Sequence, residues 1–276
     1  MCRVCVARIA TWPLVQVQPL TLSPPLSPTP PPHSQFASLS LDEAASRGGR
    51  SRRPLMVTAD VYVSELEFKN QESFRGLISS RYLPALAGEG VTVAEALRWE
   101  SKMVVETIEI AALWLADTDS LALKLDCASY CGDRARHFRL LAERLAVLGL
   151  APGSYDPRQG GYSRLFAFMR SLQTSEERAA AGFLTLAGMS AIRLGALASF
   201  CEDKGDGDSA CLLRDAILPD EERRAELGRE TLVALVSVDE TQARARRASY
   251  KTVELLTELY DPAIFRKMGG RGPTRK

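Results

Sequence analysis

Histidine is scarce in this sequence, with only two residues, His33 and His137, among 276. No segment of any length shows the apolar–polar alternation of a strand, and neither a glycine-rich phosphate loop nor a motif pairing a nucleophile with a base is present. The longest uninterrupted apolar run, residues 110–116, is far too short to cross a membrane. These absences argue against a β-rich fold, a nucleotide-binding loop and a membrane span, and they leave little imidazole for a metal site.

The net charge of +1 hides an uneven distribution. Residues 1–55 carry six arginines against Asp42 and Glu43, and residues 266–276 carry five basic residues, so the body between them has a net charge of −8. An acidic body argues against a nucleic-acid-binding core. The two basic ends need no partner to explain them.

The N-terminal region is unlike the rest of the chain. Residues 18–55 are rich in proline, serine and arginine, and such a composition cannot bury enough apolar surface to offset the entropy lost on ordering. We therefore expect residues 1–55 to be a disordered tail, with translation from Met56 as an open alternative. Because the first seventeen residues lack the apolar stretch of a signal peptide, the sequence predicts a soluble, cytoplasmic protein.

From about residue 91 the pattern is helical nearly throughout. Thr92 and Glu95 form a capping-box sequence, and Gly149 with Pro152 is expected to end the second long helix. The predicted helices cover residues 92–116, 121–148, 163–172, 174–200 and 209–248, the last kinked at Pro219, with accessory helices at 64–79 and 253–260.

This order of helices predicts an all-α fold, a four-helix bundle made of two hairpins joined by one long crossover connection. We expect residues 149–173 to cross the end of the bundle. The predicted organisation is a tail (1–55), a lead-in with an accessory helix (56–90), the bundle (91–248), and a C-terminal helix with a basic tail (249–276).

Two short stretches, residues 133–137 (DRARH) and 220–224 (DEERR), align on the template Asp-Glu-x-x-His. The template places a carboxylate and an imidazole one turn apart on the same helix face. Arg134 replaces the Glu of the first copy, and Arg224 replaces the His of the second.

With these motifs, residues 93–247 resemble the ferritin-like superfamily, whose four-helix bundles hold two iron or manganese ions. The resemblance implies an inward Glu about 34 residues before the Glu of each motif. That spacing reaches Glu100 in the first hairpin but Ala187 in the second, within a helix that has no carboxylate between residues 178 and 201. The implied ligand positions are Glu100, Arg134, His137, Ala187, Glu221 and Arg224.

Two inward carboxylates and one imidazole cannot complete the shell of a dimetal centre, and two guanidiniums at the site would repel a cation. Glu100, His137 and Glu221 are therefore predicted to mark a vestigial metal site. Arg134 and Arg224 are predicted to replace the metal charge by pairing with the two glutamates.

Two alternatives remain open at this site. The arginines could instead extend outward to surface acids such as Glu222 or Glu226. His137 could be a hydrogen-bonded core histidine or a metal ligand.

The cysteines suggest no shared centre with His137. Cys127 and Cys131 lie one turn apart, and Cys127 is about 10 Å along the helix axis from Arg134. Cys201 and Cys211 flank a turn between helices and are compatible with either a disulfide or two thiols. Cys2 and Cys5 fall in the predicted tail.

Two classes of function follow. The first is a non-catalytic ferritin-like protein without catalytic residues or a cofactor, which binds an unidentified protein or small ligand; the sequence allows a homodimer and predicts no nucleic-acid or membrane partner. The alternative is a metal-dependent oxidoreductase with an altered, mononuclear or non-standard site on Glu100, His137 and Glu221, using iron or manganese.

Overall fold

The computed structural model describes residues 58–88, 90–151, 153–261 and 263–264. Every regular element within these residues is helical, and none is a strand, so the all-α fold class is confirmed. The elements are α1 (Ala59–Leu77), η1 (Ile78–Tyr82), α2 (Leu83–Leu86), α3 (Val93–Asp117), α4 (Leu121–Val147), α5 (Arg164–Ser171), α6 (Ser175–Arg178), η2 (Ala179–Leu186), α7 (Ala187–Asp203), α8 (Gly207–Cys211), η3 (Leu212–Ile217), α9 (Leu218–Leu235) and α10 (Asp239–Leu259).

The three η elements are π-helical stretches that continue the α-helices on either side, so residues 59–86, 175–203 and 207–235 each form one long helix. A π-helical stretch inside an α-helix frequently accompanies a functional site. The longest one, η2, spans eight residues, all of them buried.

Local sequence signals account for several helix ends. Glu95 N–H donates to the Thr92 hydroxyl at 3.2 Å, and Thr92 N–H donates back to the Glu95 carboxylate at 2.9 Å, so the predicted capping box is confirmed. After the C-terminus of α4, Gly149 adopts φ = 90°, which allows the Leu150 N–H to donate to the Leu145 carbonyl at 2.9 Å. This hydrogen bond ends α4.

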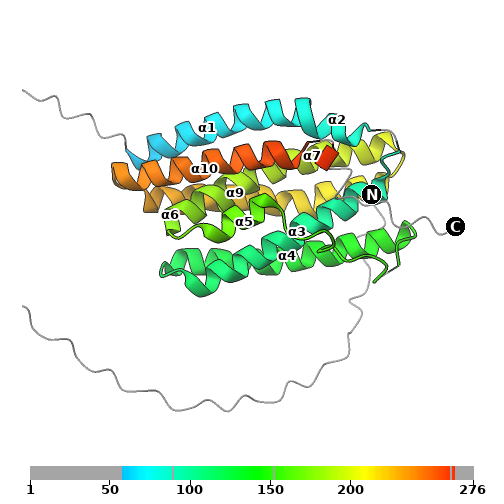
Figure 1. Cartoon of the computed structure of the whole chain (residues 1–276), viewed down its shortest axis with the longest axis horizontal. Helices are drawn as coiled ribbons and strands as arrows, with labels where there is room; N and C mark the ends of the chain where they lie inside the picture. Colours follow the sequence, from blue (N-terminus) through cyan, green and yellow to red (C-terminus); the bar gives the residue numbers. More distant parts are fainter. Residues whose placement is uncertain (1–57, 89, 152, 262, 265–276) are drawn as a thin grey trace, which may run out of the picture. The chain divides into compact units, whose positions relative to one another are not determined.

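The long helices lie side by side with their axes roughly aligned (Figure 1). α3 and α4 form one hairpin, while the helix containing α7 and the helix containing α9 form the second. Outside the second hairpin, α1 packs on α10, with the Tyr62 hydroxyl donating to the Gln242 carbonyl at 2.6 Å. The molecule therefore contains more than the four long helices predicted.

The crossover between the hairpins runs along the bundle and not across its end, contrary to our expectation for residues 149–173. Ser163 bonds to Glu106, the Met169 carbonyl accepts from Trp114, and Ser175 bonds to Thr118, so the segment follows α3 from one turn to the next. This course is required because α4 and the following long helix run in the same direction: both start beside Thr118 and end where Arg144 meets Asp206.

The predicted last helix of the bundle, 209–248, is wrong in its C-terminal part. The helix ends at Leu235, residues 236–238 are not helical, and α10 starts at Asp239. The domain boundary predicted between residues 248 and 249 therefore falls inside α10. Pro219, the predicted kink, lies inside the continuous helix 207–235, directly after η3, where π-helical turns already interrupt the regular α-helical hydrogen-bond pattern. The predicted accessory helices 64–79 and 253–260 are parts of the longer α1 and α10.

Other predictions fall on residues outside the described ranges. The disordered tail with His33, Cys2 and Cys5, the basic C-terminal end and Pro152 all belong there.

One helix among the described residues, Ser175–Asp203, is long and apolar enough to cross a membrane by length and composition. Of its most apolar window, 67% is buried against the rest of the protein. The core helix of a bundle has this same character, so the composition alone does not place the helix in a bilayer.

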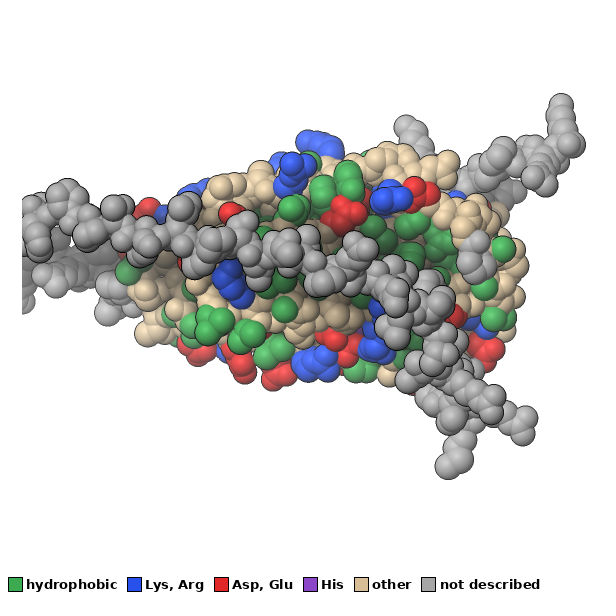
Figure 2. Space-filling model, turned by 90° about the horizontal axis from the view of Figure 1, so that it is seen from below, with side chains coloured by type: hydrophobic (Ala, Val, Ile, Leu, Met, Phe, Trp, Pro, Cys, Tyr) green, Lys and Arg blue, Asp and Glu red, His purple; other side chains and the backbone are tan. Residues whose placement is uncertain are grey.

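The face seen from below the view of Figure 1 carries hydrophobic side chains among charged side chains of both signs (Figure 2). On α4, Leu121 and Leu125 are exposed by 70% and 62%. In the visible described part of this face, basic side chains are interspersed with acidic ones.

The two helices of the second hairpin touch backbone to backbone at Gly228. A Cβ at this buried position would lie 2.5 Å from the carbonyl carbon and oxygen of Phe183. We expect Gly228→Ala to lower the free energy of unfolding by about 2 kcal/mol, because backbone and not a movable side chain blocks the methyl group. Gly132→Ala on α4, where a Cβ meets nothing within 4 Å, is the control and should stabilise by about 0.5–1 kcal/mol. Urea unfolding of both variants measures the difference, and equal effects would contradict this account.

Candidate functional site

The five predicted site residues converge in the interior of the first and second hairpins. Glu100 comes from α3, Arg134 and His137 from α4, and Glu221 and Arg224 from α9. None of them is more than 1% exposed. Both arginines therefore point inward, and the alternative that they pair with the surface acids Glu222 or Glu226 does not hold.

Arg134 and Glu221 form a buried ion pair at the centre of this group. Arg134 Nη2 lies 2.5 Å from Glu221 Oε2 and also donates to the Tyr130 hydroxyl at 2.6 Å. Burial raises the pKa of Glu221 above its usual value, an effect that Arg134 counteracts without reversing. The pair occupies the second position of both template motifs, where the resemblance implies two metal-binding glutamates.

Arg224 pairs with Asp133 and not with the two glutamates, which corrects our prediction for this residue. Its Nη2 lies 2.6 Å from Asp133 Oδ2, and its Nη1 donates to the Asp126 carbonyl at 3.2 Å. The guanidinium carbon lies 4.8 Å from the centroid of the Tyr130 ring, as does that of Arg134. Tyr130 thus makes a cation–π contact with each of the two arginines that depart from the template.

His137 is a core histidine held by a carboxylate. Its Nε2 lies 2.9 Å from Asp220 Oδ2, which also pairs with Arg136. Its Nδ1 has no hydrogen-bond partner among the described residues and lies 3.8 Å from Glu221 Oε1. Burial, with the nearby Arg134 charge, lowers the pKa of His137 to about 4, so the imidazole is neutral at pH 7.

The two motifs therefore bind each other reciprocally. The first residue of each, Asp133 or Asp220, pairs with the fifth residue of the other, Arg224 or His137. Their second residues, Arg134 and Glu221, pair together. This exchange is approximately two-fold symmetric, as expected if α4 and α9 hold equivalent places in two equivalent hairpins.

Glu100 has a partner that our sequence reasoning missed. Arg193 of α7 grips its carboxylate as a fork, with Nη2 3.0 Å from Oε1 and Nη1 on Oε2. Burial opposes ionisation of Glu100, but Arg193 outweighs it and holds the pKa below its usual value. A signal was present: Arg193 is the single basic residue between positions 179 and 203, and a lone cation in an apolar helix predicts a buried ion pair.

The remaining candidate residues do not join the cluster. Ala187, at the position where the resemblance implies an inward Glu, is buried and provides no polar group. Cys201 and Cys211 are free thiols, so the disulfide alternative does not hold. Cys127 and Cys131 are also free, and burial raises the pKa of Cys127 to about 12.

The charges in this cluster balance without a metal ion. Three arginines (134, 193 and 224) face three carboxylates (Glu100, Glu221 and Asp133), each in its own pair. No group of three or more His, Cys, Asp or Glu in the described residues is arranged to hold a metal ion. A cation would have to displace guanidiniums already bonded to both buried glutamates, so the residues present do not fit a dimetal centre.

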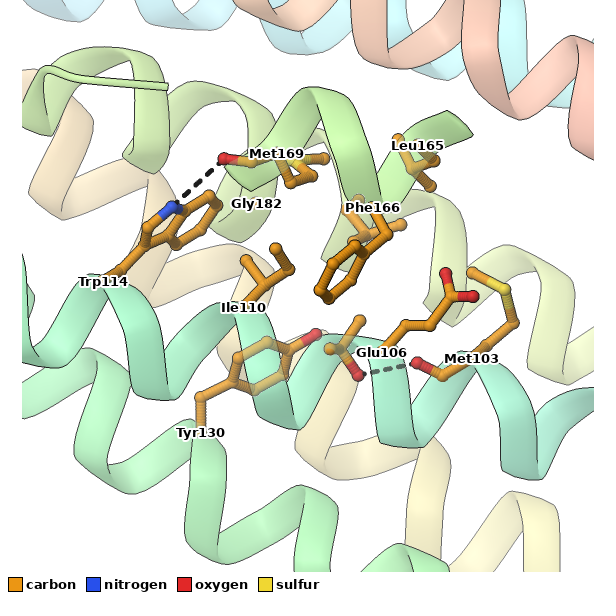
Figure 3. Close-up of a pocket in the computed structure, with 11 residues that line it drawn as sticks. Met103, Glu106, Ile110, Trp114, Tyr130, Leu165, Phe166, Met169 and Gly182 are labelled. Carbon is orange, nitrogen blue, oxygen red and sulfur yellow. Dashed lines mark hydrogen bonds between the residues drawn. The ribbon is translucent and has the colours of Figure 1, made fainter. Parts of the chain in front are cut away.

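A pocket lies beside this cluster, between α3, α4, α5 and η2 (Figure 3). Its cavity volume is about 20 Å³, which is room for about one water molecule. Its walls are almost entirely apolar, and its lining includes Met103, Ile110, Trp114, Phe166 and Met169. Tyr130, whose ring contacts both cluster arginines, is part of the same lining.

Two features of the chain form this pocket. Gly182 in η2 lets Trp114 lie against the helix, because a Cβ there would be 2.6 Å from Trp114 Cζ3. The crossover covers the other side, since the Glu106 carboxylate accepts hydrogen bonds from the backbone N–H and the hydroxyl of Ser163, the N-cap of α5.

Comparison of the chain with protein-family models, with curated proteins and with solved structures finds no match.

Proposed function

We propose that this chain is a ferritin-like helical bundle whose dimetal site has been replaced by three buried ion pairs, and that it is a non-catalytic binding module. The reciprocal pairing of residues 133–137 with residues 220–224 carries this proposal. In dimetal bundles such motifs sit on facing helices and supply a Glu and a His each. Here the same positions meet in the interior, but two of the four are arginine.

The surroundings of His137 support a metal-binding ancestry. A metal-bound histidine almost always donates its other ring N–H to a carboxylate or carbonyl. His137 keeps that arrangement, with Nε2 on Asp220 and Nδ1 directed toward Glu221 without a hydrogen bond. The course of the chain, two hairpins joined by a lengthwise crossover, is also that of a bundle with one crossover connection.

Binding is the favoured role because the cluster offers little chemistry. The buried carboxylates are saturated by guanidiniums, and the imidazole is neutral and fixed by Asp220. The alternative, an oxidoreductase with a single or non-standard metal, requires an ion to be bound at Glu100, His137 and Glu221.

Metal analysis of protein purified without oxygen separates these two functions. We expect iron and manganese far below one equivalent per chain. A four-fold variant, Arg134→Glu, Ala187→Glu, Arg193→Leu and Arg224→His, restores the ligand set and releases Glu100 from its present partner. It should take up iron or manganese as a pair of ions. Near-stoichiometric metal in the native protein would support the oxidoreductase, and a folded variant that binds no metal would refute the shared site.

A further inference from the structure

We infer that this chain forms a two-fold symmetric dimer through the exposed face of α4, which packs antiparallel on α4 of a second copy. The inference goes beyond the binding role proposed above and does not depend on the ancestry of the ion pairs. It rests on three properties of one helix face: exposed leucines, small residues at matching positions, and complementary charges at the two ends.

The outer face of α4 is apolar and exposed over its first half. Leu121 and Leu125 are exposed by 70% and 62%, and Leu113 of the adjacent α3 is exposed by 46%. Ala128 and Gly132 continue the same face at helical spacing and are also exposed. α4 lies at the edge of the bundle, with no other described helix outside it (Figure 1).

The charged residues of the same half of α4 turn away from this face, and all of them are at least partly buried. Lys124 Nζ donates to a backbone carbonyl of α3 at 3.1 Å, and Asp126 accepts from a threonine of α9 at 2.8 Å. Asp133 and Arg134 belong to the buried ion pairs described above. A helix face in water ordinarily carries charged and polar side chains, so this uncharged face indicates contact with another molecule.

The large and small residues of the face are placed so that two copies fit together. A two-fold axis beside Ala128 brings Leu125 of each copy opposite Gly132 of the other, because the two residues lie equally far from the axis, about 5 Å along the helix. A Cβ at Gly132 would meet nothing within 4 Å, so the space above it is open to a leucine side chain. The same axis places Leu121 beside Ala135 of the second copy.

The charges at the two ends of the face are complementary about the same axis. Asp119, in the turn before α4, and Arg139, in the second half of α4, are both exposed, and neither forms an ion pair within the described residues. Their positions are symmetric about the axis, so Asp119 of each copy lies opposite Arg139 of the other. Parallel packing would instead bring like charges together, which is unfavourable.

These matched features favour a second copy as the partner. A different protein would have to supply its own small residues and its own charges, and it would not require leucines and small residues of α4 to be arranged about one point. Because the face belongs to a single hairpin, we expect a reversible dimer with a dissociation constant in the micromolar range.

Sedimentation equilibrium of the full chain tests the inference and should show monomer and dimer without larger species. Gly132→Gln fills the space for Leu125 of the second copy and should raise the dissociation constant at least about tenfold. Gly76→Gln on α1 is the matched control, because a Cβ there also meets nothing within 4 Å. α1 lies on the far side of the second hairpin from α4 (Figure 1), so this variant should dimerise as the native protein does.

A charge exchange tests the antiparallel arrangement. Asp119→Arg and Arg139→Asp should each weaken the dimer about tenfold, because each places like charges opposite one another at both ends. The double variant exchanges the two charges and should restore the native dissociation constant. The inference is overturned if the native chain stays monomeric up to about 500 μM, a result that does not depend on the folding of any variant. It is also overturned if Gly132→Gln and Gly76→Gln dimerise equally, or if the double variant is no tighter than the single ones.

Discussion

Arg193→Met is expected to lower the free energy of unfolding by about 3–5 kcal/mol at pH 7. The substitution keeps much of the apolar side chain but leaves Glu100, which is 0% exposed, as a carboxylate without a counter-ion. Removing one partner of a buried pair is costly because the other charge stays desolvated and unpaired. Urea unfolding monitored by circular dichroism measures the change.

A matched control lies on the surface. Arg214 makes the same fork on Glu202, but these side chains are 38% and 49% exposed. Arg214→Met should therefore cost only about 0–1 kcal/mol. The double variant Arg193→Met with Glu100→Leu should recover much of the lost stability, since it removes the unpaired charge as well. Similar losses in the buried and the exposed variants would show that Arg193 and Glu100 are not paired inside the protein.

The second large effect concerns pH. The pKa of His137 is about 4 in the folded protein, against an ordinary value of 6.5, because burial and Arg134 disfavour the charged ring and Asp220 only partly offsets them. Between pH 6.5 and about pH 4 the unfolded chain binds a proton at this residue that the folded protein does not. The free energy of unfolding is therefore unaffected by this residue above pH 6.5 and decreases as the pH falls from 6.5 toward 4.

This pKa shift lowers the free energy of unfolding by about 3 kcal/mol in total as the pH falls below 6.5. About 2 kcal/mol of this decrease occurs between pH 7 and pH 5. His137→Gln keeps an amide that can donate to Asp220 but does not titrate. Between pH 7 and pH 5, the free energy of unfolding of this variant should therefore fall by about 2 kcal/mol less than that of the native protein. The lowered pKa values of Glu100 and Asp220 act at lower pH, because carboxyl groups ordinarily titrate well below imidazole groups. Parallel pH curves for the native protein and His137→Gln would contradict the buried, neutral imidazole.

Much of the fold could be predicted from the order of residues, because the signals involved are local. The capping box at Thr92 and Glu95 and the glycine stop at Gly149 need only near neighbours in the chain. Residues 236–238 were the weakest point, since no glycine or proline marks this break and the pattern on both sides is helical. The lengthwise course of the crossover was missed because it follows from the direction of the helices it connects.

By itself, the sequence determined that the body is helical and that residues 133–137 and 220–224 align on a single template. These properties depend on spacing along the chain, which a helix converts directly into position on a face. The tertiary structure alone decided the partners. Arg224 pairs with Asp133, and Arg193 pairs with Glu100. Tyr130 lies between these ion pairs and the pocket. Which buried charges meet depends on the direction and offset of helices far apart in sequence, and desolvation then requires each of these charges to find a partner.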